Sequence, residues 1–233
     1  MRILAIGDIH GCARSLDALL SAVRPTPEDL IVTLGDYVDR GPDSRGVLDR
    51  LIALRTKGQL MSLRGNHDLM MLHASKWAEA VPIWLACGGQ STLASYGLTS
   101  LTPDDLELIP HAHWDFLERD CVNWYETATH VFVHASIHPD LALSDQPESL
   151  LLWEKLDRPV EHFSGKIVVC GHTRQISGVP VHWGKTVCID TGAYAPGGWL
   201  TCLDVLEGCY WQANESGQLR GGWVEEQVPA SND

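Results

Sequence analysis

The chain has 233 residues, 45% of them hydrophobic and 20% charged, so it is long enough to bury a substantial core. Its formal net charge of −13 argues against binding to a nucleic-acid polymer or to an anionic membrane surface. No apolar run approaches the ~18 residues that a membrane helix needs, and the run at the N-terminus is too short for a signal peptide. The seven cysteines include no CxxC pair, which is typical of reduced thiols. We therefore expect a cytoplasmic protein that contacts no membrane.

Six short apolar runs are each followed by a glycine or a turn and then by polar side chains. In chain order they are ILAIGDIHG, LIVTLGDYVDRG, LMSLRGNHD, VFVHAS, IVVCGHT and VCIDTGA. Runs of this length, rich in Ile, Val and Leu, predict buried strands. Apolar residues at helical spacing from Leu16 to Val23 and from Val47 to Leu54 predict helices between the first strands. The alternation predicts an α/β fold with layers of helices on sheets whose central strands are largely parallel.

The middle of the chain has a different character. Residues from about 69 to 126 are predicted to be a mostly helical, insert-like region, with a helix start at Thr102-Pro103. From Gly184 onward the pattern is again typical of strands, and residues from about 214 to 233 form a polar C-terminal tail. No repeat or linker interrupts the chain, so we expect a single domain over residues 1–233.

The polar side chains that follow the strands are candidates for one shared site, because ligands of open α/β sheets bind at the carboxyl ends of the strands. Asp8 and His10 are two residues apart, so in an extended segment both point the same way and can bind one metal ion. Carboxylate, imidazole and amide ligands suit Mn²⁺, Fe²⁺ or Zn²⁺ better than Ca²⁺. Six candidate ligands exceed what one catalytic ion needs, which favours two ions that share a carboxylate. The other four candidates are Asp36, Asn66, His134 and His172.

The motifs GDIHG, GDYVDRG, LRGNHD, VHAS and GHT resemble those of the phosphoprotein-phosphatase branch of the calcineurin-like metallophosphoesterases. The resemblance continues through WLACGGQSTLASYG, LLLWEK and IDTGA and therefore covers nearly the whole chain in the family's order. The sequence is most similar to the bacterial and phage serine/threonine protein phosphatases and to their symmetrical dinucleoside-tetraphosphatase relatives. The family's fold, a layered sandwich of central mixed β-sheets flanked by helices, is thereby implied.

The resemblance also implies the roles of the candidate ligands. Asp8 and His10 would hold the first metal and Asp36 would bridge the two ions. The second metal would be held by Asn66, His134 and His172. Two divalent ions are expected, with Mn²⁺ favoured and Fe, Zn or Mg as alternatives.

The catalytic residues are implied in the same way. His67 would be the general acid that protonates the leaving oxygen, and Asp39 would orient it. A carboxylate partner raises the pKa of a histidine, which agrees with this role. Arg40 matches the family's phosphate-binding arginine, whose planar fork fits two phosphate oxygens. The implied mechanism is direct attack by metal-bound hydroxide without a phosphoenzyme.

Among the departures from the family pattern, two concern cations. Lys155 stands where a second phosphate-binding arginine is expected, and a lysine keeps the charge but loses the bidentate geometry. The family's GHTP reads GHTR here, so Arg174 lies two residues after His172. We hypothesise that Arg174 takes over part of the missing arginine's role in substrate binding.

Three functions compete on this sequence. The favoured one is a two-metal phosphomonoesterase of the serine/threonine protein phosphatase type, acting on a phosphorylated protein or peptide. The alternative is a symmetrical dinucleoside tetraphosphatase or a related hydrolase of nucleotides, polyphosphates or another small phosphorylated metabolite. A metal-binding scaffold without catalysis is the third, and the presence of both His67 and Asp39 argues against it.

Overall fold

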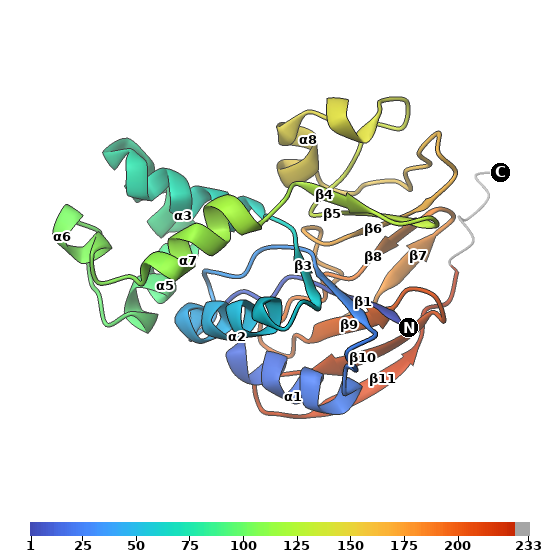
Figure 1. Ribbon diagram of the computed structural model, residues 1–233, viewed down its shortest axis with the longest axis horizontal. Helices are drawn as coiled ribbons and strands as arrows, with labels where there is room; N and C mark the ends of the chain where they lie inside the picture. Colours follow the sequence, from blue (N-terminus) through green and yellow to red (C-terminus); the bar gives the residue numbers. More distant parts are fainter. Residues whose placement is uncertain (227–233) are drawn as a thin grey trace.

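The computed structural model describes residues 1–226 and contains two β-sheets that pack face to face, with helices on their outer faces (Figure 1). The first sheet has the strand order β11-β10-β9-β1-β2-β3 and the second has the order β4-β5-β6-β8-β7. The strands of the first sheet are β1 (Ile3–Ile6), β2 (Leu30–Thr33), β3 (Leu60–Ser62), β9 (Leu200–Asp204), β10 (Cys209–Ala213) and β11 (Leu219–Trp223). Those of the second are β4 (Trp124–Glu126), β5 (His130–Val133), β6 (Ile167–Cys170), β7 (Val181–Trp183) and β8 (Thr186–Cys188). Mixed sheets between layers of helices are the predicted fold class.

The central strands of each sheet are parallel, as predicted. In the first sheet β1 pairs with β2 and β2 pairs with β3, and in the second sheet β5 pairs with β6 and β6 pairs with β8. The outer strands pair in the antiparallel direction. Because parallel strands end at the same edge, the polar loops after β1, β2 and β3 leave one edge of the first sheet. The loops after β5, β6 and β8 leave one edge of the second sheet in the same way.

The strand β1 is apolar throughout because both of its faces are buried. Ile3 and Ala5 lie in the core between the two sheets, together with Phe132 of the second sheet. Leu4 and Ile6 point the other way, into the core under the helices of the first sheet. Successive side chains of a strand alternate between its faces, so a strand with two buried faces shows no polar alternation.

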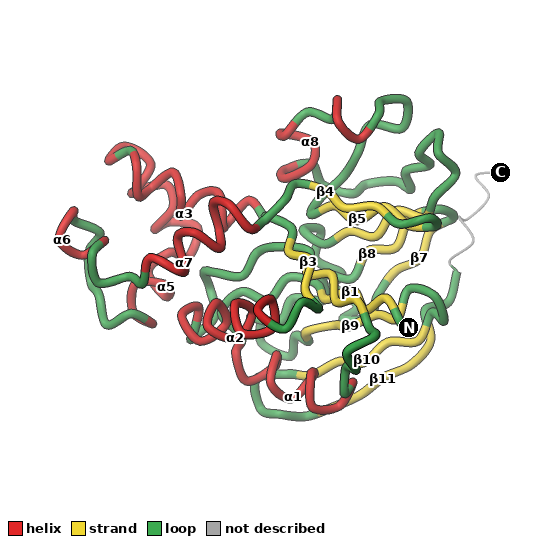
Figure 2. Tube along the Cα trace, in the orientation of Figure 1, coloured by secondary structure: helices red, strands yellow, loops and turns green. Residues whose placement is uncertain are grey.

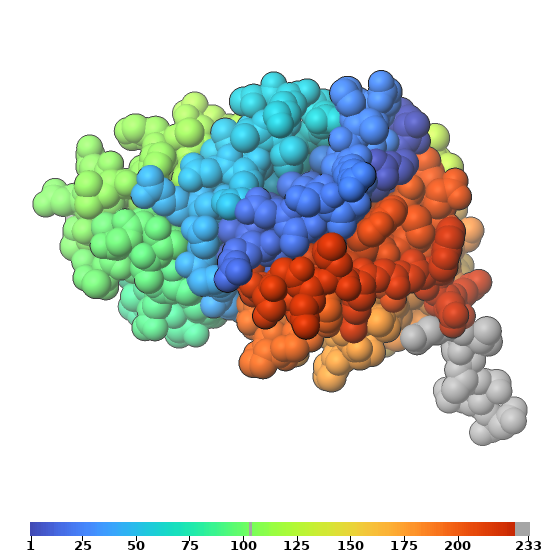
Figure 3. All heavy atoms as spheres, turned by 90° about the horizontal axis from the view of Figure 1, so that it is seen from below, coloured from blue at the N-terminus to red at the C-terminus, as the bar shows by residue number. Residues whose placement is uncertain are grey.

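Three helices flank the sheets. α1 contacts β9, β10 and β11, and Figure 3 shows it lying along the C-terminal strands. Its buried residues include Leu16, Leu19 and Val23, as the sequence spacing predicts. Leu151 and Leu152 of α8 pack into the core on the outer face of the second sheet. The three helices are α1 (Ala13–Val23), α2 (Ser44–Thr56) and α8 (Glu148–Trp153), the last preceded by a short 3₁₀ turn, Leu143–Asp145.

The other helices form one group beside the strands, which we call the helical arm (residues 66–120; Figure 2). The sequence predicts helical structure over about residues 69–126, whereas the helices end at Asp120 and residues 124–126 form β4, which pairs with β5. The helical arm comprises α3 (Asn66–Lys76), a 3₁₀ turn (Ala78–Ala80), α4 (Val81–Trp84), a π-helical turn (Leu85–Gly89), α5 (Gln90–Ser95), α6 (Pro103–Leu106), α7 (His111–Asp115) and a second π-helical turn (Phe116–Asp120).

Part of the predicted polar tail over about residues 214–233 is a strand, because residues 219–223 form β11 and pair with β10. This strand reads LRGGW, a polar and glycine-rich run that gives no strand signal. Residues 227–233 lie outside the described residues. Within residues 1–226, no helix has the length and apolar character needed to cross a membrane. The single-domain organisation of residues 1–233 stays a prediction.

Candidate active site

The loops at the carboxyl ends of the strands contain most of the strained backbone of the molecule. In the described part of the chain, six residues other than glycine have a positive φ, and five of them follow β1, β2 or β6. Such conformations cost roughly 1–3 kcal/mol each and cluster at functional sites, where the surroundings enforce them. These five residues are His10, Asp36, Asp39, Arg40 and His172.

Hydrogen bonds join the first three of these loops. The backbone N–H of His10 donates to the carbonyl oxygen of Asp36 at 2.7 Å. The carboxylate of Asp68 is buried and accepts three backbone N–H groups, each at 2.9 Å. These N–H groups belong to Asp36, Tyr37 and Gly65, so Asp68 fixes the loop after β2 against the loop after β3. Sequence reasoning missed Asp68, although a carboxylate three residues after a helix-starting glycine is a capping signal.

Asp36 is shared by two groups of side chains that could hold a metal ion, and the candidate ligand atoms within each group lie within 4.8 Å of one another. Oδ2 of Asp36 is 3.3 Å from Nε2 of His10. Oδ1 of Asp36 is 3.5 Å from Nε2 of His134. The first group consists of His10, Asp36 and His67, and the second of Asp36, His134 and His172.

The other two predicted ligands adjoin these groups. Oδ1 of Asn66 lies 3.0 Å from Nε2 of His134 and 3.1 Å from Nδ1 of His172. Asp8 lies outside both groups, but its carboxylate accepts the backbone N–H of His172 at 3.0 Å. A Cβ at position 171 would lie only 2.0 Å from Oδ1 of Asp8, so Gly171 permits this contact. The loops after β1, β2, β3, β5 and β6 thus bring all six predicted ligands to one place.

Backbone carbonyls fix the tautomers of two of the histidines. Nδ1 of His10 donates to the carbonyl of Val38 at 2.9 Å, and Nδ1 of His134 donates to the carbonyl of Leu34 at 2.8 Å. Because a carbonyl oxygen only accepts, each Nδ1 carries the proton and each Nε2 presents a lone pair toward Asp36. A histidine held in this way is the usual arrangement of a metal ligand in proteins.

The electrostatics of the site suit divalent cations. Burial, with repulsion from the carboxylates of Asp190 and Asp36, raises the pKa of Asp8 well above its usual range. Burial and Asp36 likewise raise the pKa of Asp190 to about 6. Burial lowers the pKa of His10 to about 3 and that of His172 to about 4, so both imidazoles are neutral and able to bind a metal. Crowded buried carboxylates beside neutral imidazoles form a donor set that fits first-row divalent ions.

His67 and Asp39 form a buried pair at the edge of this centre. Nδ1 of His67 donates to Oδ2 of Asp39 at 2.7 Å, which leaves Nε2 for another partner. Burial opposes the charged imidazole, but the carboxylates of Asp36 and Asp39 outweigh it and raise the pKa of His67. A histidine with a raised pKa can arrive protonated near neutral pH and can act as a general acid.

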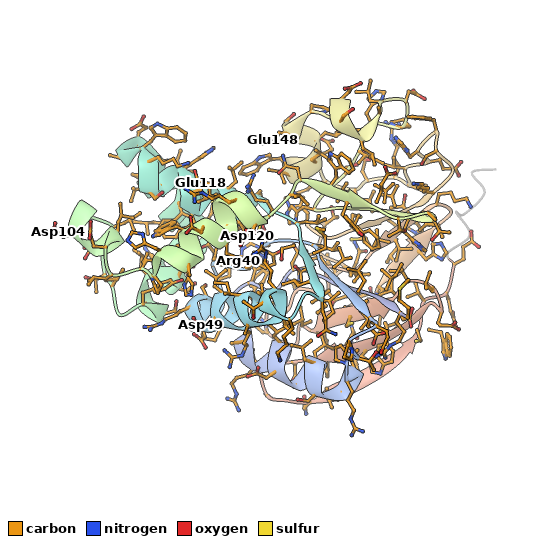
Figure 4. The ribbon with its side chains drawn as sticks, in the orientation of Figure 1. Arg40, Asp49, Asp104, Glu118, Asp120 and Glu148 are labelled. Atoms are coloured by element: carbon orange, nitrogen blue, oxygen red, sulfur yellow. The ribbon has the colours of Figure 1, made fainter. Side chains whose placement is uncertain are left out.

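A cleft of about 390 Å³ opens over these residues. The three cations predicted to bind substrate all line it, and Figure 4 shows Arg40 where the helical arm meets the strands. Apolar Ile176 at the cleft is almost fully exposed. The lining residues are Asp36, Arg40, Asn66, His67, Lys155, His172, Thr173, Arg174, Ile176, Asp190 and Tyr194.

Tyr194 supports Arg40 and was missed by sequence reasoning. The guanidinium carbon of Arg40 lies 4.7 Å from the centre of the Tyr194 ring, a cation–π distance. The same ring packs edge-on against His10, with 4.9 Å between the ring centres. Nη1 of Arg40 also lies 3.0 Å from Nε2 of His10. Tyr194 follows the IDTGA motif by one residue, and its distance in sequence from Arg40 conceals the contact.

Comparison with known proteins identifies the family. The model of the calcineurin-like phosphoesterases matches residues 1–187, so the chain belongs to this family, as its motifs predict. Among solved structures, a serine/threonine phosphatase from Saccharomyces cerevisiae superposes with a TM-score of 0.62 over 99% of this chain and 82% of its own, at 14% identity. A metallophosphoesterase from Sphaerobacter thermophilus gives a TM-score of 0.53 over 97% of this chain and 89% of its own, at 19% identity. These likenesses confirm the predicted fold.

Sequence relatives carry two different activities in their names. Serine/threonine-protein phosphatase 1 of Salmonella typhimurium is 34% identical over 161 residues, which is 66% of this chain and 63% of the relative. The symmetrical bis(5'-nucleosyl)-tetraphosphatase of Pseudomonas fluorescens is 34% identical over 145 residues, which is 61% of this chain and 46% of the relative. The chain therefore spans less than two thirds of the length of these relatives.

Proposed function

We propose that this chain is a metal-dependent phosphoesterase that hydrolyses phosphomonoesters, and that its substrates are phosphoserine and phosphothreonine in proteins or peptides. One observation carries the proposal: two groups of metal-binding side chains share Asp36, and one of them adjoins the buried pair of His67 and Asp39. A pure metal-binding scaffold has no use for a histidine with a raised pKa beside a cleft. A cytoplasmic location fits the seven cysteines, all of which are free thiols.

The donor set fits two divalent ions. Asp8 and His10 would hold one ion, and Asp36 would contact both. The second ion would be held by Asn66, His134 and His172. Mn²⁺ is the ion we favour, with Fe, Zn or Mg as alternatives. When bound, such ions neutralise phosphate oxygens and activate a water molecule as nucleophile.

The side chains of the cleft supply the remaining steps. The guanidinium of Arg40, held against the ring of Tyr194, presents a planar pair of donors to phosphate oxygens and orients the ester. The Nδ1–H of His67 stays hydrogen-bonded to the Asp39 carboxylate, and its Nε2–H donates a proton to the leaving oxygen. That transfer lets a basic alkoxide, such as that of serine or threonine, leave as a neutral alcohol. The resulting phosphate and alcohol are the two products.

Hydrolysis of symmetrical dinucleoside tetraphosphates is the second candidate function. Lys155 and Arg174 line the same cleft as Arg40, and three cations suit a polyphosphate better than a single phosphate. Relatives named for this activity support it equally.

The two candidates are separated by kcat/KM, measured in Mn²⁺ buffer for a phosphothreonine peptide and for diadenosine tetraphosphate. We expect a peptide preference of about tenfold or more, which corresponds to about 1.4 kcal/mol of transition-state binding. A preference of about tenfold or more for the dinucleotide instead would make the chain a nucleotide hydrolase. Turnover of neither would refute both, and His67→Asn serves as the control that locates the activity in this cleft.

A further inference from the structure

The carboxylate of Asp39 accepts hydrogen bonds from two residues besides His67. Nε1–H of Trp84 donates to both oxygens, at 2.9 Å to Oδ1 and 3.0 Å to Oδ2. The hydroxyl of Thr92 donates to Oδ1 at 2.8 Å. Asp39, Trp84 and Thr92 are all 0% exposed, so water does not compete for these bonds. The orientation of the carboxylate is therefore set by protein donors alone.

The directions of the hydrogen bonds around Thr92 follow from its single hydroxyl proton. Because Thr92 gives that proton to Asp39, its oxygen accepts the backbone N–H of Asp39 at 2.8 Å. The same oxygen lies 3.0 Å from the hydroxyl of Ser44, which then must donate to it. Thr92 thus binds both the side chain and the backbone of Asp39, a residue held at a φ of 74°.

Both donors come from the helical arm, far along the chain from the residues that they hold. Trp84 ends α4 and Thr92 lies in α5, whereas Asp39, the residue that they hold, lies in the loop after β2. Gly89 permits the arrangement, because a Cβ there would lie 2.5 Å from the indole ring of Trp84. Neither Trp84 nor Thr92 is among the residues that line the cleft, and both are 0% exposed.

We propose that Trp84 and Thr92 are positioning residues for the general acid. Their donors occupy the other hydrogen-bonding positions of the Asp39 carboxylate, so that Oδ2 faces Nδ1 of His67 in a single orientation. The imidazole is then held with Nε2 available to the leaving oxygen. This inference rests on the proposed function, and it assigns the WLACGGQSTLASYG segment of the helical arm to the alignment of the acid.

Conservative variants test the inference. Thr92→Val removes the hydroxyl and keeps the branched shape, Trp84→Phe replaces the indole by a smaller aromatic ring without an N–H, and Thr92→Ser keeps a hydroxyl. Each is assayed as the full-length Mn²⁺-loaded protein on an aryl phosphate with an acidic leaving phenol and on a phosphothreonine peptide with a basic leaving alkoxide. We expect Thr92→Val and Trp84→Phe to lower kcat about tenfold or more on the peptide and only slightly on the aryl ester, with KM unchanged. Thr92→Ser is expected to recover the peptide activity.

A matched control separates positioning from general destabilisation. The hydroxyl of Tyr96 bonds to Nδ1 of His113 at 2.6 Å, also in the helical arm but without contact to Asp39. Tyr96→Phe therefore removes a comparable partly buried hydrogen bond and is expected to leave both activities unchanged. The inference would be overturned if Thr92→Val lowered kcat equally on the two esters. It would also be overturned if Thr92→Val lowered kcat as much in the His67→Asn background as it does in the wild type. Unchanged peptide turnover would overturn it as well.

An NMR measurement keeps this test independent of turnover. In the wild type, the Nδ1 proton of His67 is expected to be protected from exchange and shifted downfield by its bond to Asp39. Thr92→Val should lose that protection, and Tyr96→Phe should keep it. Protection retained in Thr92→Val refutes the positioning role whatever the substrate. If neither ester is hydrolysed while the loss of protection is seen, the proposed function fails and the positioning of His67 stands.

Discussion

Replacing Gly171 by alanine is expected to displace Asp8 and to lower activity with little effect on the rest of the fold. The added Cβ would lie 2.0 Å from Oδ1 of Asp8, where an ordinary contact needs 3.4 Å or more. The carboxylate must therefore move by about 1.4 Å, the difference between these two distances. That movement breaks the bond of 3.0 Å that the Asp8 carboxylate accepts from the backbone N–H of His172.

The expected magnitude follows from the size of this displacement. A misplacement of ~1 Å in a catalytic centre costs on the order of 10²-fold in rate, so kcat/KM should fall by about that factor. The concentration of Mn²⁺ needed for half-maximal activity should rise, because Asp8 is proposed to hold a metal. Gly171 does not have a positive φ, so alanine adds no backbone strain and the effect is steric.

Gly165→Ala is the matched control. Gly165 has a φ of +69° and no atom within 4 Å of the position of a Cβ, so alanine there strains the backbone without touching the site. It should cost about 1 kcal/mol in the free energy of unfolding and leave kcat/KM unchanged. Steady-state kinetics across a Mn²⁺ titration compare the two variants. A kcat/KM for Gly171→Ala within about threefold of the wild type would refute the placement of Asp8 in the metal centre.

Three further predictions concern the acid, the substrate and the fold. His67→Asn should lower kcat by about 10²–10⁴-fold while elemental analysis finds the wild-type metal content, and unchanged turnover would remove His67 from the mechanism. Arg174→Ala should weaken inhibition by inorganic phosphate about three- to tenfold, and an unchanged inhibition constant would refute a role for Arg174 in phosphate binding. The side-chain hydrogen bond from Arg2 holds the pKa of Asp29 well below its usual value. Asp29 therefore stabilises the fold at pH values above its unfolded pKa of about 3.9, and this contribution is lost as the pH falls toward the lower pKa of the folded state. In urea titrations between about pH 5 and 2, the unfolding free energy of Asp29→Asn should depend less on pH than that of the wild type, and equal slopes would contradict the assignment.

The convergence of the candidate ligands was predictable because each follows a buried strand by only a few residues. Asp8 follows β1 and Asp36 follows β2, and parallel strands deliver their carboxyl ends to one edge. His172 follows β6 in the same way in the second sheet. The apolar runs and the motifs were therefore enough to predict the fold class and the convergence of the six candidate ligands.

The support of the site could not be predicted in the same way, because it depends on contacts between distant parts of the chain. Trp84 and Thr92 reach Asp39 across 45 and 53 residues, and the WLACGGQSTLASYG motif that contains them does not indicate this contact. Asp68 resembles an ordinary helix-start carboxylate until its bonds to Asp36 and Tyr37 are seen. The strand β11 was missed for a similar reason, since pairing with β10 rather than apolar alternation defines it.

We propose that two divalent ions at the centre around Asp36 drive hydrolysis. The most direct measurement titrates chelator-stripped protein with Mn²⁺ and follows bound metal and the hydrolysis of an aryl phosphate in the same samples. We predict no turnover in the stripped protein and full activity when two ions are bound per chain, with Asp36→Asn losing both metal binding and activity. Turnover that survives the chelator, or full activity with a single ion bound, would contradict the account.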